Sequence, residues 1–226
     1  MHQRWRALLF LHFPVETDEI QRLLPPGLTV DTYPDSTGKK MAWVGLVPFR
    51  MEGVTLRGIP EIPRIHAFPE TNVRTYVHQE GRCPGVWFFS LDAANTLACR
   101  VARRFYHLPY HEAHMSVVET PGAAAYRSTR RSDAAVCNVD CTIGDALPPP
   151  KPGSLEFFLV ERYLLYSLRE NDLFTGRVFH KPYPIQAAQA NVLGESLIEA
   201  AGIEKHPFVH TLFSSGVDVE VFPLRH

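Results

Sequence analysis

Residues 68–92 read FPETNVRTYVHQEGRCPGVWFFSLD, in which two strand-like runs flank a turn that contains Pro84. Successive side chains on a strand point to opposite faces. The first run therefore separates a β-branched face from a polar face, and the polar face carries Glu70, Asn72, Arg74 and Tyr76. This alternation predicts a strand that packs on one side and holds something polar on the other. The turn predicts that the second run returns as the partner strand of a hairpin.

The register of this hairpin decides which polar side chains meet. If Arg74 pairs with Ser90, then Asn72 and Asp92 lie on the same face as these two residues. A slip by a single residue sends them to opposite faces. We take the first arrangement as the hypothesis.

Most of the remaining chain also has strand-like character, and helical spacing is clearest between residues 94 and 105, with Asp92 placed as its N-cap. Shorter helices are predicted after Thr17 and after Ser154, each placed as an N-cap, and around 195–201. The prolines between 58 and 69 predict an irregular loop. Strands are predicted at 1–13, 28–33, 41–51, 113–119, 123–130, 135–143, 208–214 and 217–224. The first of these is interpreted as a buried strand, and the last two as a hairpin that turns at Ser215-Gly216. Many strands with few helices favour an α+β, mainly antiparallel fold. We expect a closed or nearly closed β-barrel with a few peripheral helices, as one domain over residues 1–226.

Composition narrows the classes of partner. The 226 residues are 45% hydrophobic and 21% charged, with a net charge of -1, so no global field favours nucleic acid or an anionic membrane. No apolar run reaches the roughly 18 residues of a membrane span. The four cysteines lack zinc-like spacing, which favours free thiols in a reducing, cytoplasmic compartment. We predict no membrane or nucleic-acid partner and no cofactor or metal, and the sequence leaves the oligomeric state open.

Several motifs together resemble one known family. They are Leu24-Pro25-Pro26-Gly27, Ala42-Trp43-Val44-Gly45, FPETNVRTYV, PGVWFFSLDA, Leu108-Pro109-Tyr110, Glu161-Arg162-Tyr163 and Gly216-Val217-Asp218-Val219. Over nearly its whole length the chain is similar to the YqjF-like family of uncharacterised bacterial proteins, also called DUF2071. This resemblance implies an acetoacetate decarboxylase-like fold, a β-barrel or cone around a small-molecule cavity, and it carries no settled activity.

The decarboxylase mechanism needs a lysine amine that forms a Schiff base with a ketone. In that enzyme class a lysine pair follows a helix and a short aromatic-proline element. Here the analogous place reads Leu108-Pro109-Tyr110-His111, and lysine occurs only at positions 39, 40, 151, 181 and 205. The sequence therefore argues against Schiff-base chemistry, since function resides in the site and not in the fold.

Two interpretations of the polar cluster remain open. In the first, a small organic acid or carbonyl compound occupies the barrel: Arg74 binds its anionic group, Glu70 or Asp92 transfers a proton, and the other candidate binding residues are Asn72, Tyr76, Ser90 and His180. In the second, the cluster is an ion-pair network that organises the sheet of a non-catalytic ligand-binding or scaffolding protein. A cavity lined by Arg74 and a carboxylate favours the first, and a filled interior favours the second.

Overall fold

The computed structural model describes residues 1–55 and 67–226, over which the chain forms 13 strands and four helices. The strands are β1 (His2–Val15), β2 (Thr29–Val30), β3 (Tyr33–Pro34), β4 (Lys40–Thr55), β5 (Ala67–Gln79), β6 (Arg82–Ala93), β7 (Tyr110–Thr120), β8 (Ala123–Arg130), β9 (Val136–Ala146), β10 (Leu164–Arg169), β11 (Asp172–His180), β12 (Ile185–Glu195) and β13 (His210–Val221). The helices are α1 (Thr17–Gln21), α2 (Thr96–Tyr106), α3 (Leu155–Val160) and α4 (Leu197–Ala200).

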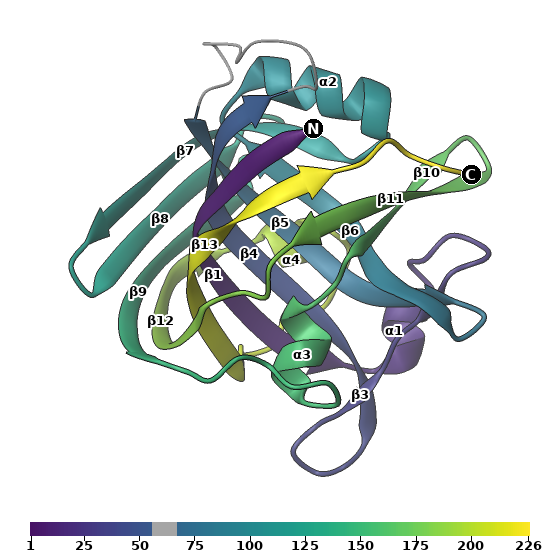
Figure 1. Ribbon diagram of the computed structural model, residues 1–226, viewed down its shortest axis with the longest axis horizontal. Helices are drawn as coiled ribbons and strands as arrows, with labels where there is room; N and C mark the ends of the chain where they lie inside the picture. Colours follow the sequence, from purple (N-terminus) through teal and green to yellow (C-terminus); the bar gives the residue numbers. More distant parts are fainter. Residues whose placement is uncertain (56–66) are drawn as a thin grey trace.

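The strand pairings close on themselves. The order is β11-β10-β6-β7-β8-β9-β12-β13-β1-β4-β5-β2, and β11 also pairs with β13 while β6 pairs with β5. Two rings result, which share β13, β1, β4, β5 and β6. The first ring is completed by β10 and β11, and the second ring by β7, β8, β9 and β12 (Figure 1). Most pairings are antiparallel, with β6 parallel to β7 and to β10, so the predicted barrel is confirmed.

The shared strands are buried on both faces because each face meets a different core. Along β1, Leu8 and Phe10 belong to one hydrophobic cluster, while Leu9, Leu11 and Phe13 belong to another. A strand that is buried on both sides reads as a near-continuous apolar run. This explains the sequence ALLFLHF, which is a buried first strand as expected.

The central hairpin forms between β5 and β6, but its register differs from the hypothesis. Val73 pairs with Ser90 and Arg74 pairs with Phe88, so one residue of β6 is extra at this point and forms a β-bulge. Asp92 consequently pairs with Thr71. The placement of Ser90 and Asp92 on the face of Arg74 was therefore wrong.

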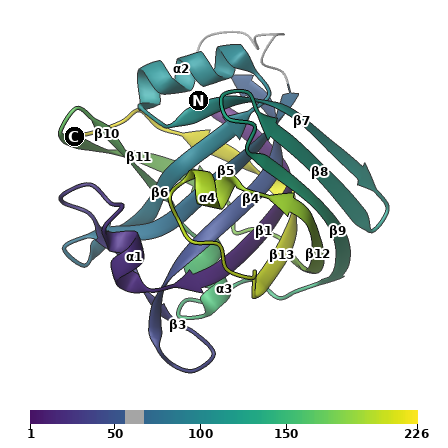
Figure 2. The same cartoon turned by 180° about the vertical axis from the view of Figure 1, so that it is seen from behind.

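Helix α2 lies across one end of the first ring (Figures 1 and 2). Its N-cap is Asn95, whose side-chain oxygen accepts a hydrogen bond from the Ala98 amide at 2.9 Å. The predicted cap, Asp92, lies inside β6 instead, because its backbone pairs with Thr71. At α3 the predicted cap is confirmed: Ser154 Oγ accepts from the Phe157 amide at 3.2 Å.

Some predicted boundaries also change. The predicted strand at 28–33 is split into β2, which pairs with β5, and β3, which pairs with β4. The predicted hairpin at 208–224 is one strand, β13, in which Gly216 adopts φ +134°. At α1 the residue in the cap position is Glu16, not Thr17, and it makes no side-chain capping bond. The predicted loop at 58–69 falls mostly on residues 56–66, outside the described residues, and its last three positions belong to β5.

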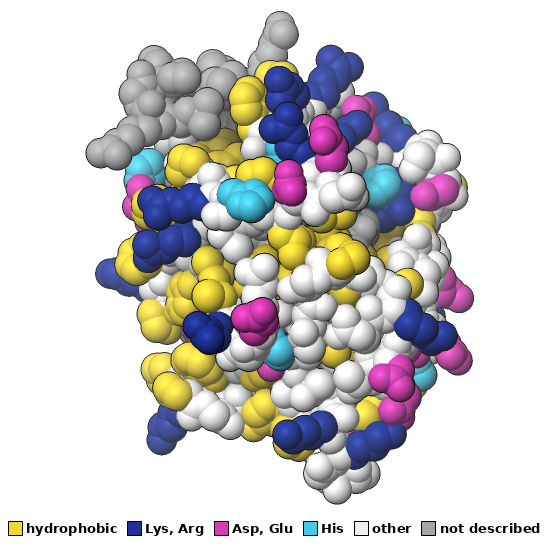
Figure 3. Space-filling view, turned by 90° about the vertical axis from the view of Figure 1, so that its right-hand side faces the viewer, with side chains coloured by type: hydrophobic (Ala, Val, Ile, Leu, Met, Phe, Trp, Pro, Cys, Tyr) yellow, Lys and Arg dark blue, Asp and Glu magenta, His cyan; other side chains and the backbone are white. Residues whose placement is uncertain are grey.

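None of the helices in the described part of the chain has the length and hydropathy that a bilayer crossing requires. On the face drawn in Figure 3, Lys and Arg side chains are interspersed with Asp and Glu, with hydrophobic side chains between them. This mixture agrees with the net charge of -1.

Candidate functional site

A cavity of about 140 Å³ lies inside the first ring, beneath α2. The polar face of β5 contributes Glu70, Asn72 and Arg74 to its lining, as the alternation in the sequence predicts. Apolar side chains make most of the remaining wall, among them Trp5, Leu8, Phe49, Phe88, Leu91 and Val178. A mostly apolar cavity with a few polar groups is the usual form of a small-molecule site.

Arg74 is buried and only partly hydrogen-bonded. Its Nη2 donates to the carbonyl oxygen of Leu159 at 3.0 Å, and the guanidinium lies 5.6 Å from the ring centre of Phe10 and 5.7 Å from that of Tyr76. Its Nε atom has no hydrogen-bond partner. Within residues 1–55 and 67–226, no carboxylate lies within ion-pair distance of Arg74. A buried cation of this kind is expected to attract an anionic group, because leaving a charge unpaired in an apolar environment is costly.

Tyr76 lies behind Arg74, outside the cavity lining. Its hydroxyl donates to the same Leu159 carbonyl at 2.8 Å, and its ring supports the guanidinium. Tyr76 therefore positions Arg74.

Glu70 lies two strand positions beyond Asn72 and is buried. The hydroxyl of Tyr110 donates to Glu70 Oε2 at 2.9 Å. Burial raises the pKa of Glu70 to about 8, an effect that the Tyr110 hydrogen bond reduces and the negative charge of Asp92 increases. Glu70 is therefore mostly a neutral carboxylic acid at pH 7, which has a proton to donate into the cavity.

Asn72 lies between the acid and the cation on the same face. Its side-chain oxygen is buried without a hydrogen-bond partner. Together, Glu70, Asn72 and Arg74 form a row in which a ligand finds an acid proton, an amide and a positive charge.

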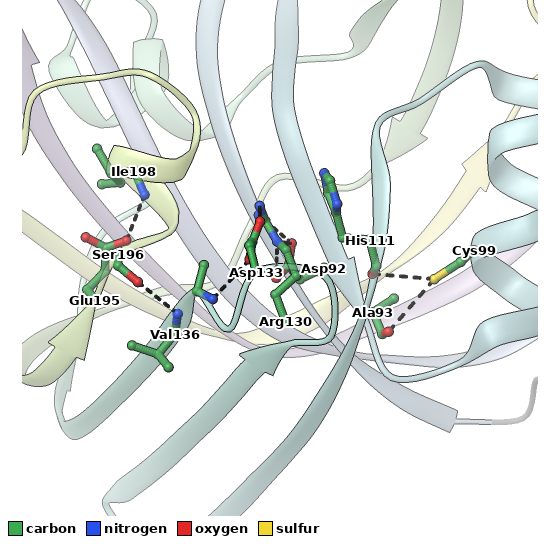
Figure 4. Close-up of polar contacts among 11 residues, drawn as sticks. Asp92, Ala93, Cys99, His111, Arg130, Asp133, Val136, Glu195, Ser196 and Ile198 are labelled. Carbon is green, nitrogen blue, oxygen red and sulfur yellow. Dashed lines mark hydrogen bonds and ion pairs between the residues drawn. The ribbon is translucent and has the colours of Figure 1, made fainter.

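Asp92 and Ser90 lie on the other side of the sheet. Arg130 holds Asp92 through both of its oxygens, with Nη2 at 2.8 Å and Nε at 3.1 Å, and Asp133 lies beside the pair (Figure 4). Burial raises the pKa of Asp92, and the hydrogen bonds and charge of Arg130 oppose this. The geometry resembles the architectural ion pair of the second interpretation. Ser90 Oγ is buried there without a partner.

His180 lies beside the cavity rather than in its lining. Its ring packs among Trp5, Tyr163 and Tyr183, with the Tyr183 ring centre at 4.5 Å. Its Nδ1 lies 2.8 Å from the Lys181 carbonyl oxygen, so Nδ1 carries the proton. Burial lowers the pKa of His180, which keeps the ring neutral. His180 supports Tyr183, which does line the cavity.

Sequence reasoning missed several residues of the lining. Tyr110, Tyr183 and Arg162 all contact the cavity. Arg162 is already paired with Asp31 at 2.8 Å, and its guanidinium lies over the Phe158 ring. Only the aromatic content of the segments around Tyr110 and Tyr183 offered a signal. Tyr110 reaches the site because β7 pairs with β6, and Tyr183 reaches it from the segment between β11 and β12.

Glu161, which precedes Arg162, is not part of the cavity lining, and both of its carboxylate oxygens accept hydrogen bonds from other residues. Its Oε1 accepts from the Tyr183 amide at 3.0 Å, and its Oε2 accepts from the Tyr163 hydroxyl. Glu161 thereby ties the C-terminal end of α3 to the segment between β11 and β12.

The lysines lie elsewhere. All five, at positions 39, 40, 151, 181 and 205, are exposed, and none contributes to the lining of the cavity. The lining of the cavity among the described residues therefore includes no lysine amine of the kind that attacks a ketone in the decarboxylase mechanism.

Solved structures with the same architecture define the class of the fold. An acetoacetate decarboxylase from Legionella pneumophila superposes with a TM-score of 0.64 at 14% identity, covering 99% of this chain and 85% of that one. The enduracididine biosynthesis enzyme MppR, complexed with pyruvate, gives a TM-score of 0.59 at 14% identity, with 98% and 89% covered. The protein thus has an acetoacetate decarboxylase-like fold.

Sequence comparison then gives the family. The DUF2071 family, described as an uncharacterized conserved protein, matches residues 2–218. The uncharacterized protein YqjF of Bacillus subtilis (strain 168) is 37% identical over 230 residues, which covers 100% of this chain and 91% of that protein. The chain belongs to the DUF2071 family, as its motifs indicated.

Proposed function

We propose that this protein binds a small organic acid or carbonyl compound in the cavity of the first ring, with Arg74 holding the anionic group. The observation that carries the proposal is the state of Arg74: its Nε is buried without a partner, and no described carboxylate pairs with it. A guanidinium binds a carboxylate through two parallel hydrogen bonds, which is the interaction that this side chain lacks.

Glu70 supplies the proton in this proposal. A neutral carboxylic acid gives its proton to a carbonyl oxygen while a solvent water molecule removes an α-hydrogen as a proton, which converts the keto compound into its enol; the reverse step returns a proton from the solvent to the α-carbon. Asp92 has no part in the step, because Arg130 already binds it on the other side of the sheet. The names of two structural neighbours, an acetoacetate decarboxylase and an enzyme complexed with pyruvate, support small oxo acids as the first compounds to test.

Binding is tested by calorimetric titration with pyruvate, 2-oxobutyrate and acetoacetate. Arg74→Met keeps the volume and removes the charge, and it is expected to weaken binding about 10- to 100-fold, which corresponds to the loss of one charge-assisted hydrogen-bonded contact. Arg127→Ala, which removes an arginine paired with Asp140 on the surface, is the control and is expected to bind like the wild type. Equal affinities of the wild type and Arg74→Met would contradict the assignment of Arg74.

Proton transfer is tested separately by NMR in deuterated water. The wild type is expected to exchange the α-hydrogens of a bound oxo acid for deuterium, and Glu70→Gln is expected to bind the acid without exchanging them. Binding with no exchange in the wild type would favour the non-catalytic binding protein. The buried, bidentate Asp92–Arg130 pair supports a purely architectural role for that half of the polar cluster.

We also propose a cytoplasmic location. All four cysteines are free, and three of them are buried, which suits a reducing compartment.

A further inference from the structure

We infer that the ligand is a monocarboxylate whose apolar body has about six carbon atoms. This inference rests on the proposed function and narrows it from small organic acids in general. Three features of the cavity carry it: its volume, the chemistry of its wall and the number of unpaired charges.

The volume sets the size of the body. The cavity measures about 140 Å³. An engineered apolar cavity of about 150 Å³ in another protein holds benzene, so a body of about six carbons fills a space of this size. Acetate or pyruvate would leave most of the cavity empty, and contacts with the wall would be lost.

The wall sets the polarity of the body. Side chains from opposite sides of the ring are apolar, including Leu8 and Val47 from β1 and β4 and Val178 from β11. The end beneath α2 is closed by Ala98, Val101 and Ala102. A body made of hydrocarbon gains free energy on leaving water for such surroundings, whereas a polar group placed against this apolar part of the wall, away from the polar row of β5, would lose its hydration without replacement.

The unpaired charges set the number of anionic groups at one. Of the two described arginines in the lining, Arg162 is already bound to Asp31, which leaves Arg74. The Met1 ammonium group, which also lines the cavity, donates to the Val221 carbonyl oxygen at 2.8 Å, and Gln3 Oε1 accepts from Trp5 Nε1 at 2.9 Å. The unpartnered polar atoms of the described lining, Arg74 Nε and Asn72 Oδ1, lie together on β5. Among the described lining residues, a second carboxylate would meet no further unpaired side-chain cation, and the ammonium group of an amino acid would meet no ionised carboxylate, because Glu70 is neutral.

The test is a calorimetric titration series with acetate, butyrate, hexanoate, decanoate, phenylacetate, adipate and 1-hexanol. Affinity is expected to rise about fourfold for each methylene from acetate to hexanoate and to stop rising by decanoate. Phenylacetate is expected to match hexanoate. Adipate, in which a second carboxylate replaces the terminal methyl group of hexanoate, and 1-hexanol, which lacks the anion, are each expected to bind at least tenfold more weakly than hexanoate.

Two variants, Ala102→Leu and Arg74→Met, separate the effect of size from the effect of charge, and Ala200→Leu is the control. Ala102→Leu adds three carbon atoms to the wall beneath α2, and it is expected to weaken hexanoate more than tenfold while acetate changes little. Ala200→Leu makes the same change at an exposed position of α4 and is expected to leave both affinities unchanged. Arg74→Met is expected to reduce hexanoate binding to the level of 1-hexanol.

The outcomes distinguish this inference from the proposed function. If acetate, pyruvate or adipate binds as tightly as hexanoate and Arg74→Met weakens that binding, the ligand class is wrong and the proposed function stands. If no carboxylate of any length binds in an Arg74-dependent manner, both are wrong. If Ala102→Leu leaves hexanoate binding unchanged, the body does not occupy this cavity and the inference is overturned.

Discussion

The substitution Glu70→Gln is expected to remove a large pH dependence of stability. Burial raises the pKa of Glu70 from an ordinary 4.5 to about 8 in the folded protein. Each pH unit of that gap corresponds to about 1.4 kcal/mol, so the whole gap corresponds to about 5 kcal/mol. Glutamine has a similar shape and no proton to lose, so the variant lacks this dependence.

The sign follows from which state holds the proton. Between the two pKa values the folded protein keeps the Glu70 proton, whereas the unfolded chain has released it. The stabilising contribution is fully present below about 4.5 and is lost as the pH rises through about 8, so the free energy of unfolding falls with pH. Burial lowers the pKa of His12 and of His180, and these groups act in the opposite direction below about pH 6.5.

The assay is urea denaturation of both proteins at intervals from about pH 5 to about pH 9. The two proteins share the histidines, so the difference between their free energies of unfolding isolates Glu70. That difference is expected to change by about 4 kcal/mol between pH 5 and pH 8. Glu80→Gln, at an exposed glutamate, is the control and is expected to follow the wild type.

Parallel pH profiles of the wild type and Glu70→Gln would refute the reasoning, because they would mean that Glu70 is ionised in the folded protein at neutral pH. Infrared difference spectra give an independent check. The wild type at pH 7 is expected to show the C=O band of a protonated carboxyl group that is absent from the variant.

Three further predictions concern the scaffold. Arg130→Met is expected to lower the free energy of unfolding by about 3–5 kcal/mol, because it leaves Asp92 buried and unpaired, and the double variant that adds Asp92→Leu is expected to recover most of this loss in urea denaturation. Gly216→Ala is expected to lower the melting temperature far more than Gly122→Ala. A Cβ at residue 216 would lie 2.1 Å from a backbone oxygen, whereas a Cβ at residue 122 would meet nothing within 4 Å. Equal effects of the two substitutions would contradict this reasoning. A thiol reagent is expected to modify Cys83 alone in the folded protein and all four cysteines after unfolding, and rapid labelling of more than one thiol would show that the described burial is wrong.

The sequence predicted the faces of β5 because alternation is a local property. Glu70, Asn72 and Arg74 share one face, and Thr71, Val73 and Thr75 share the other, as a period of two requires. The same rule applied to β6 failed at one point. The bulge between the pairs Val73–Ser90 and Arg74–Phe88 adds a residue that nothing in the alternation of VWFFSLD marks.

That one residue moved Ser90 and Asp92 out of the candidate site.

Asp92 also illustrates competition between local and non-local signals. Both Asp92 and Asn95 are good helix caps, and the choice between them is made by the pairing of Asp92 with Thr71, which continues β6 past the point where a helix could begin.

Contacts with side chains from distant strands could not be predicted from local sequence patterns. Tyr110 reaches Glu70 because β7 runs parallel to β6, and Arg130 reaches Asp92 from the end of β8. Neither contact can be read from the spacing of residues along the chain. The parallel pairing of β6 with β7 joins segments through a long connection, and it also brings Arg130, on the next strand β8, close to Asp92.

The second ring packs against the side of β5 that faces away from the cavity, where Val73 belongs to its core. The backbone of β5 is thus anchored by side chains that no ligand touches. The side chains of β5 that face the cavity are consequently not needed to hold the strand in place. A mutational library confined to those positions should yield folded proteins with altered ligand preference at an unusually high rate, and relatives with different ligands should be able to share one framework.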